Sequence, residues 1–331
     1  MEDEEIDDFK PQYPAELYTS RPNDTALLSP IYDFTFKGIF TQETEESYLA
    51  LRSFITAAIG REVRAVTLKS NEPVTDTKKQ KKMTFDVSVE FNDGELADIE
   101  MQAWNQNYDY GMRAEIQAAR LLTNNAKKTK KWYSPKVYQI SVINFHYKKD
   151  DNKELTWYTM QDNCGNRLTD RLNVIFIDLV TIRKKDNIPI EQLSPIERWG
   201  LFFSFVDHKE KKVLLKNLVK SEEGIMAANN IVKHMSKADS NWFTQNSIYM
   251  AECDYNTRLY NAKQKGIEEG REEGLKEGIE KGIKQGIFES AKKLLKKNTL
   301  TPEQIAENLD LTVEKVLELK KEISKKEVSK K

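Results

Sequence analysis

Two carboxylates on opposite sides of a short turn are the residues best suited to chemistry in this sequence. Asp86 precedes the turn and Glu100 follows it, in segments where apolar and polar residues alternate with period two. Such alternation on both sides of Asn92-Asp-Gly94 predicts a β-hairpin over residues 84–104. The apolar faces carry Phe85, Val87, Val89 and Phe91 on the first strand, and Ala97, Ile99, Met101 and Ala103 on the second.

The register of this hairpin follows from its apolar faces, because a slip of one residue would set apolar side chains of one strand beside polar side chains of the other. A two-residue Asp-Gly turn fails that test. A three-residue loop at residues 92–94 passes it, leaves Gly94 at the left-handed position and pairs Asp86 with Glu100. Directly opposed residues have Cβ atoms about 4.5–5.5 Å apart. The same polar face carries Ser88, Glu90, Asp98 and Gln102.

Opposed like charges destabilise a sheet unless something neutralises them, and a divalent cation would do so. Oxygen ligands without a nearby His or Cys favour Mg²⁺ or Mn²⁺ over zinc. A bound metal lowers the pKa of its water and stabilises charge on a phosphodiester, and Gln102 could hold or orient that water. The alternative that the pattern leaves open is a solvent-exposed polar strand face without a metal.

The scarcity of His and Cys narrows the chemistry. The chain has 331 residues with only three His and two Cys. Cys164 and Cys253 stand far apart, which excludes disulfide scaffolds, zinc ribbons and iron–sulfur clusters. His146, His208 and His234 are isolated, so no His pair has metal-ligand spacing. Paired carboxylates with a hard cation therefore remain as the main catalytic option.

The hairpin needs other elements to position it, and the surrounding patterns predict helices and strands. Apolar residues three and four apart predict one helix at residues 31–60 that ends at Gly60, and another at residues 109–131. The second helix would bury Met112, Ile116, Ala119 and Leu122. Further strands are predicted at residues 63–68, 137–145, 155–160 and 172–182. Residues 189–261 have a helical pattern.

A glycine recurs every four residues in a Lys/Glu-rich segment, at Gly266, Gly270, Gly274, Gly278, Gly282 and Gly286. Each glycine costs a helix about 0.5–1 kcal/mol relative to Ala, so we expect a charged, weakly helical stalk that needs a partner to be firm. A solvated linker is the alternative. Thr301 and Pro302 then begin a helix within a small module that resembles the helix-turn-helix of DNA readers, although such modules also serve only as caps.

Charge and hydropathy bear on partners and location. The 52 Lys+Arg nearly balance 53 Asp+Glu, so any DNA-binding surface must be local. Basic runs at residues 78–82 and 127–131, together with Lys37, are candidates, and the alternative is that all of them are ordinary solvated lysines. The acidic start, residues 1–8, is the opposite of a signal peptide, and the densest apolar run is about 11 residues, far short of a membrane span of about 20. We therefore expect a cytoplasmic protein without membrane association.

Asp86 followed by Glu100-Met-Gln102 resembles the Asp-Xn-Glu-x-Gln form of the PD-(D/E)XK nuclease superfamily. The surroundings are similar to its recombination-promoting nuclease and transposase branch. The supporting segments are Pro30-Ile-Tyr-Asp-Phe-Thr-Phe-Lys-Gly-Ile-Phe40, Arg113, Tyr138-Gln-Ile-Ser-Val-Ile-Asn-Phe145 and the stalk with its terminal module. The likeness spans roughly residues 27–325. Two departures are Gln102 in the place of the usual Lys, and residues 113–117 without the Tyr expected about four residues after Arg113.

The resemblance implies a restriction-endonuclease-like α/β core, a mixed sheet of about four strands flanked by helices, that cleaves DNA with Mg²⁺ or Mn²⁺. Asp86 and Glu100 would bind the metal, joined by the backbone carbonyl of Met101. Gln102 would act in place of the catalytic Lys.

Supporting residues also follow from the resemblance. Asp33, or less directly Glu43 or Glu46, would supply a further acidic group from the first helix. The residues expected to contact DNA are Lys37, Lys78, Lys79, Lys81, Lys82 and Arg113.

The predicted organisation has six parts: an acidic arm (1–26), a nuclease-like core (27–185), an all-α extension (186–261), the stalk (262–288), the helical module (289–325) and a basic tail (326–331). We expect a Mg²⁺-dependent DNA endonuclease associated with recombination or a transposable element, without a small-molecule cofactor. Homo-oligomers could form through the stalk. The alternative is a non-catalytic DNA-binding or assembly protein that retains the fold.

Overall fold

The computed structural model describes residues 20–70, 85–92, 94–104, 109–126, 132–148 and 152–328. The chain divides into two units, Met1–Met250 and Ala251–Lys331. Of the predicted basic runs, residues 78–82 and 127–131 lie outside the described residues.

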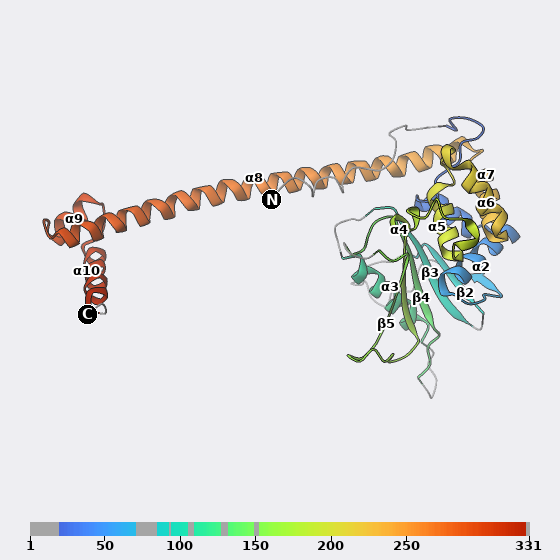
Figure 1. Ribbon diagram of the computed structural model, residues 1–331, viewed down its shortest axis with the longest axis horizontal. Coiled ribbons are helices and arrows are strands. Elements are labelled where there is room, and N and C mark those ends of the chain that lie inside the picture. Colours follow the sequence, from blue (N-terminus) through green and yellow to red (C-terminus); the bar gives the residue numbers. More distant parts are fainter. Residues whose placement is uncertain are drawn as a thin grey trace. The chain divides into compact units, whose positions relative to one another are not determined.

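A mixed sheet of six strands forms the described part of the first unit together with helices on both faces (Figure 1). The strands are β1 (Val66–Leu68), β2 (Val87–Phe91), β3 (Glu95–Gln102), β4 (Val137–Ile143), β5 (Leu155–Thr159) and β6 (Leu172–Asp178). Their order is β1-β2-β3-β4-β6-β5, with β3, β4 and β6 parallel and the outer pairings antiparallel. The expected mixed sheet with flanking helices is confirmed. It has six strands instead of about four, because β1 and β5 extend its two edges.

One face of the sheet is covered by helices from both ends of the unit. The helices are α1 (Asp33–Phe40), α2 (Glu45–Ile59), α5 (Pro195–Phe205), α6 (Lys212–Ser221) and α7 (Glu223–Met235). The aromatic residues Phe36, Phe54, Trp199 and Phe203 are fully buried and pack with the apolar side chains of the strands in one core. The ring centroids of Phe36 and Phe203 are 5.4 Å apart, and those of Phe54 and Trp199 are 5.5 Å apart.

The single helix predicted at residues 31–60 is in fact two helices. The Thr44 side chain accepts a hydrogen bond from the backbone N–H of Ser47 and so begins α2 separately from α1. Gly60 ends α2 as expected, with a φ of 68° that suits glycine. The strand predicted at residues 172–182 also ends early, because Asp178 accepts a hydrogen bond from the Thr181 N–H and begins α4 (Leu179–Arg183).

The opposite face of the sheet carries α3 (Tyr110–Asn124), which begins at the N-cap residue Asp109. The predicted buried stripe of this helix is wrong: Met112 is 57% exposed and Ile116 is 51% exposed. The buried residues are Tyr110, Ala114, Gln117, Ala118 and Leu121. The reason is that α3 covers a part of the sheet that carries buried carboxylates, so its inner side needs hydrogen-bond donors and small residues.

The second unit contains most of α8 (Asp239–Lys297), followed by α9 (Pro302–Asn308) and α10 (Val313–Val328). All six regularly spaced glycines lie within α8, and the apolar residues Ile267, Leu275, Ile279 and Ile283 between them are each more than half exposed. A small core at the end joins the last three helices through Ala291, Ile305, Ala306, Val316 and Leu319. Thr301 caps α9 in a capping box with Gln304, as its sequence predicts. None of the described helices is apolar over a length that would cross a membrane.

Candidate active site

The β2–β3 hairpin has the register that its apolar faces predict. Val87 pairs with Ile99, and Phe91 pairs with Glu95. Gly94 has a φ of 88°, as the three-residue loop requires, and Asn92 also adopts a positive φ of 47°. Asp86 lies one residue before β2, so the same register sets it opposite Glu100. The predicted register is confirmed for the strand residues. The assignment of Asp86 and Glu100 as a site stays a prediction, in keeping with the effect of the Glu100 charge on the pKa of Asp86, which it raises.

Glu100 is fully buried and is held by three donors from α3. The Tyr110 hydroxyl donates to Glu100 Oε2 at 3.1 Å, and the Arg113 guanidinium donates to Oε1 at 3.2 Å. The Gln117 side-chain amide also donates to Oε1. These donors are spaced i, i+3 and i+7, which places them on one side of the helix. Burial, followed by the negative charge of Glu100, raises the pKa of Tyr110 well above its ordinary value, so the phenol remains a donor.

Asp86 is held by one cation from α1. Lys37 Nζ lies 2.9 Å from Asp86 Oδ1 and 2.7 Å from Asp33 Oδ2, so a single ammonium joins two carboxylates. Burial raises the pKa of Asp86 to about 7, and the charges of Glu100 and Asp33 add to this effect while Lys37 opposes it. Burial acts to lower the pKa of Lys37, but the Asp86 and Asp33 charges outweigh it and the pKa is raised. The ammonium form of Lys37 is thus favoured.

A second buried carboxyl group lies beside Glu100 on the same face. Asp98 is fully buried, and its register partner on β4 is Gln139, just as Ser141 is the partner of Glu100. Burial raises the pKa of Asp98 well above its ordinary value, with further contributions from Glu100 and Asp86. Asp98 therefore keeps its proton to a higher pH than an exposed carboxyl group does.

The other residues inferred from the family resemblance lie as follows. Gln102 is the last residue of β3 and shares the face of Glu100, while the Met101 side chain is buried on the opposite face. The Glu46 side chain accepts a hydrogen bond from Asn230 at 3.0 Å, and Glu43 is exposed. The basic residues Lys78, Lys79, Lys81 and Lys82 lie outside the described residues.

Three residues that surround Glu100, namely Tyr110, Gln117 and Asp98, are not part of the Asp-Xn-Glu-x-Gln motif. Tyr110 and Gln117 contact Glu100 directly, and Asp98 lies next to it. Tyr110 and Gln117 could have been found from their spacing to Arg113 in the sequence, because residues 110, 113 and 117 share one helical face. Asp98 gave a weaker signal as a further acidic residue on the polar face of the hairpin.

The carboxylate oxygens of the site fit a small hard cation. Within the described ranges, no group of three or more His, Cys, Asp or Glu residues is arranged to hold a metal ion. Mg²⁺ requires less than this, since it is commonly bound through one or two carboxylates and keeps several waters. Asp86 and Glu100 supply two such carboxylates. Asp33 Oδ1 is a further buried oxygen without a hydrogen-bond partner in the described structure.

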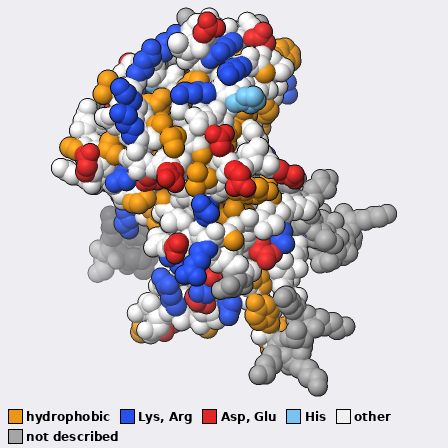
Figure 2. Space-filling model, turned by 90° about the vertical axis from the view of Figure 1, so that its right-hand side faces the viewer, with side chains coloured by type: hydrophobic (Ala, Val, Ile, Leu, Met, Phe, Trp, Pro, Cys, Tyr) orange, Lys and Arg blue, Asp and Glu red, His pale blue; other side chains and the backbone are white. Residues whose placement is uncertain are grey.

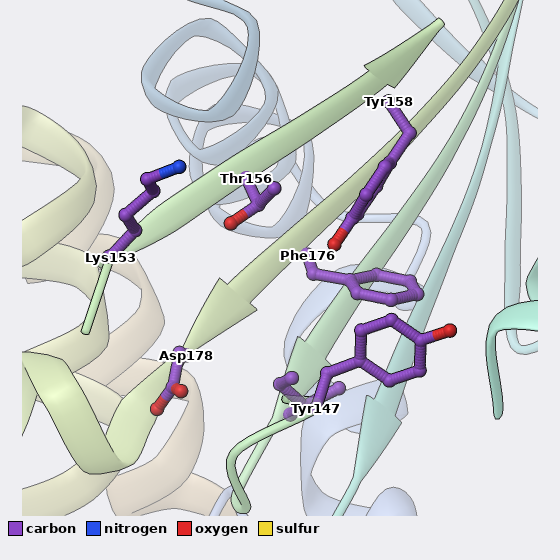
Figure 3. Close-up of a pocket in the computed structure, with 7 residues that line it drawn as sticks. Tyr147, Lys153, Thr156, Tyr158, Phe176 and Asp178 are labelled. Carbon is purple, nitrogen blue, oxygen red and sulfur yellow. The ribbon is translucent and has the colours of Figure 1, made fainter. Parts of the chain in front are cut away.

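A separate cavity lies farther along the same sheet face (Figure 3). Its lining residues are Ile143, Tyr147, Lys153, Thr156, Tyr158, Phe176 and Asp178. The rings of Tyr147 and Phe176 are 4.9 Å apart, and His146 Nδ1 lies 2.7 Å from Asp178 Oδ2. The cavity is built on β4, β5 and β6, and neither Asp86 nor Glu100 lines it.

Comparison with known proteins assigns the family. No curated protein and no solved structure matches the chain. A family model described as PD-(D/E)XK nuclease family transposase matches residues 30–262, a range that contains Asp33, Asp86, Glu100 and the α3 donors. Because this match covers well over half of the sequence, the chain belongs to the PD-(D/E)XK nuclease family transposases.

Proposed function

We propose that the chain is a Mg²⁺- or Mn²⁺-dependent endonuclease that hydrolyses phosphodiester bonds in DNA, in recombination or as part of a transposable element. The observation that carries this proposal is the hairpin register, which sets Asp86 opposite Glu100, together with the polar side chains of α1 and α3 that contact these two carboxylates. Family membership supports the nuclease class. The two carboxylates support the choice of a hard divalent cation.

Each side chain in the cluster has a distinct part in this proposal. Asp86 and Glu100 would hold the metal together with the Met101 carbonyl. When bound, the metal would lower the pKa of a water molecule and stabilise negative charge on the phosphate. The Tyr110 and Arg113 donors fix the orientation of the Glu100 side chain, so this carboxylate is already in place before a metal binds. Gln102 carries no charge, and its amide would orient a water molecule by hydrogen bonding.

DNA contact would be local, because the chain as a whole carries a formal charge of −1. Lys37 and Arg113 bring positive charge to the carboxylates themselves. The face in Figure 2 carries basic and acidic side chains interspersed over its surface. We infer that the lysines at residues 78–82 add to the DNA-binding surface, and that the protein acts in the cytoplasm.

A second candidate function is a non-catalytic DNA-binding or assembly protein. The specific observation in its favour is the row of exposed apolar side chains on α8, at Ile267, Leu275, Ile279 and Ile283. A Cβ atom added at any of the regularly spaced glycines would meet nothing within 4 Å outside the backbone of the helix itself, so another helix has room to approach closely. The stalk would then join copies of the chain.

Plasmid nicking in Mg²⁺ or Mn²⁺ separates the two functions. Wild type should cut, whereas Asp86→Asn and Glu100→Gln should lose at least 100-fold in rate, on the order of the effect of losing a metal ligand or its partner. Glu90→Gln is the matched control, because Glu90 lies in β2, the strand that follows Asp86. Its carboxylate pairs with Lys69 at 2.7 Å near the sheet edge. Metal-dependent cutting that survives both site substitutions would defeat the site assignment. No cutting by any version would favour the assembly protein.

A further inference from the structure

Lys37 lies where a cation is needed at the carboxylate pair. It is the fifth residue of α1, one turn after Asp33, and its ammonium lies 2.9 Å from Asp86 Oδ1. The Lys37 side chain is 30% exposed and that of Asp86 only 14% exposed. The contact therefore joins the first helix to the hairpin at a site that is largely withdrawn from water.

An ordinary helix-surface role does not account for this arrangement. An i,i+4 pair such as Asp33 and Lys37 is common on helices and contributes only about 0.2–0.5 kcal/mol. The contact with Asp86 is different, because it joins α1 to the residue that precedes β2, 49 positions later in the sequence. The apolar contacts of α1 come from Phe36, Ile39 and Phe40, so the helix packs without needing Lys37.

The charges around the site leave Asp86 dependent on Lys37. The Arg113 guanidinium is engaged with Glu100. Among the described residues, Lys37 is the one whose ammonium forms an ion pair with Asp86. Gln102, two residues after Glu100, brings no charge of its own. The positive charge next to Asp86 thus comes from α1.

We propose that Lys37 is the resident cation of the site: its ammonium neutralises Asp86 before metal binds, and it competes with the divalent cation for that carboxylate. The inference rests on the proposed function, since it takes Asp86 to be a metal ligand. Two cations that share one carboxylate repel each other strongly at separations of a few ångströms. Lys37 is therefore a positioning residue that sets how tightly the metal is held.

The test is a titration of the metal-free, full-length protein with Mn²⁺ at pH 8, followed by isothermal calorimetry. Lys37→Met, which keeps an unbranched side chain of nearly the same length but removes the charge, should bind Mn²⁺ on the order of tenfold more tightly than wild type. Lys37→Arg keeps the charge and should stay within about twofold of wild type. Lys69→Met is the matched control, because it removes a lysine paired with Glu90 and should leave the affinity unchanged.

Equal or weaker Mn²⁺ binding by Lys37→Met would overturn the proposal, because a purely structural lysine would give that result. Lys37→Gln provides the same comparison if the Met variant does not fold, with far-UV circular dichroism as the check on folding. Failure of the proposed function looks different. Wild type would then bind no Mn²⁺, or Asp86→Asn would bind it as tightly as wild type. If Mn²⁺ binding required Asp86 but its affinity did not change in the Lys37 variants, the competition between Lys37 and the metal would be refuted. The proposed function would still hold.

Discussion

Asp86 should make the metal-free protein less stable as pH rises, and Asp86→Asn should remove this penalty. Burial and the neighbouring carboxylates raise the pKa of Asp86 from 3.8 to about 7 in the folded protein. A carboxyl group with a raised pKa binds a proton more tightly in the folded state than in the unfolded state. Its contribution to the free energy of unfolding therefore falls as pH rises from about 4, and it reaches its lowest level above pH 7.

The size of the effect follows from those two pKa values. Ionisation of Asp86 should lower the free energy of unfolding by roughly 2 kcal/mol at pH 5 and by about 4 kcal/mol at pH 8. Asn has the shape of protonated Asp without the ionisation, so Asp86→Asn should gain more stability at pH 8 than at pH 5, by up to about 2 kcal/mol.

Urea unfolding in EDTA at the two pH values, followed by tryptophan fluorescence, to which the buried Trp199 contributes, measures this difference. Glu90→Gln is the control, because Glu90 is 39% exposed and pairs with Lys69 at the sheet edge. Its effect should be small at both pH values. Equal destabilisation by Asp86→Asn at pH 5 and pH 8 would refute the reasoning. It would mean that Asp86 stabilises the fold through its hydrogen bonds, and that ionisation of its buried carboxyl group does not lower the free energy of unfolding.

Three further substitutions test local features. Tyr110→Phe keeps the ring but removes a donor to buried Glu100, so it should lower the free energy of unfolding by about 1–3 kcal/mol in urea, and an unchanged value would show that the bond does not form. In Gly94→Ala the new methyl group would make only an ordinary contact with the Glu90 carboxylate, but the φ of 88° disfavours Ala, so the substitution should destabilise by roughly 1–2 kcal/mol in the same assay. Gly266→Ala, in open space within α8, should instead raise helicity by circular dichroism and stabilise by about 0.5–1 kcal/mol; a loss of helicity would contradict the helical assignment.

The register of the hairpin could be predicted from the sequence because it depends on a local pattern. Period-two alternation and the Asn92-Asp-Gly94 turn allow one face-matched pairing, and the observed partners Val87 and Ile99 agree with it. The buried face of α3 could not be predicted in the same way. Apolar spacing favoured Met112 and Ile116, but the helix covers a polar part of the sheet, so hydrophobicity pointed to the wrong side.

The contacts that surround the motif could not be predicted from local sequence patterns either. The contact between Lys37 and Asp86 joins residues 49 positions apart, and no periodicity relates them. Lys37 resembled an ordinary basic residue suited to DNA. Asp33, by contrast, was expected near the site from the family resemblance, and the structure brings it to the same ammonium as Asp86.

The shared core of the first unit has a consequence for fragments of this chain. Phe36 and Phe54, from helices before the sheet, pack against Phe203 and Trp199, from a helix that follows its last strand. A fragment that stops at residue 185 would keep every acidic residue of the site but would expose the rings of Phe36 and Phe54 to water. We expect such a fragment to aggregate, and we expect the smallest soluble piece that carries the site to extend through α7.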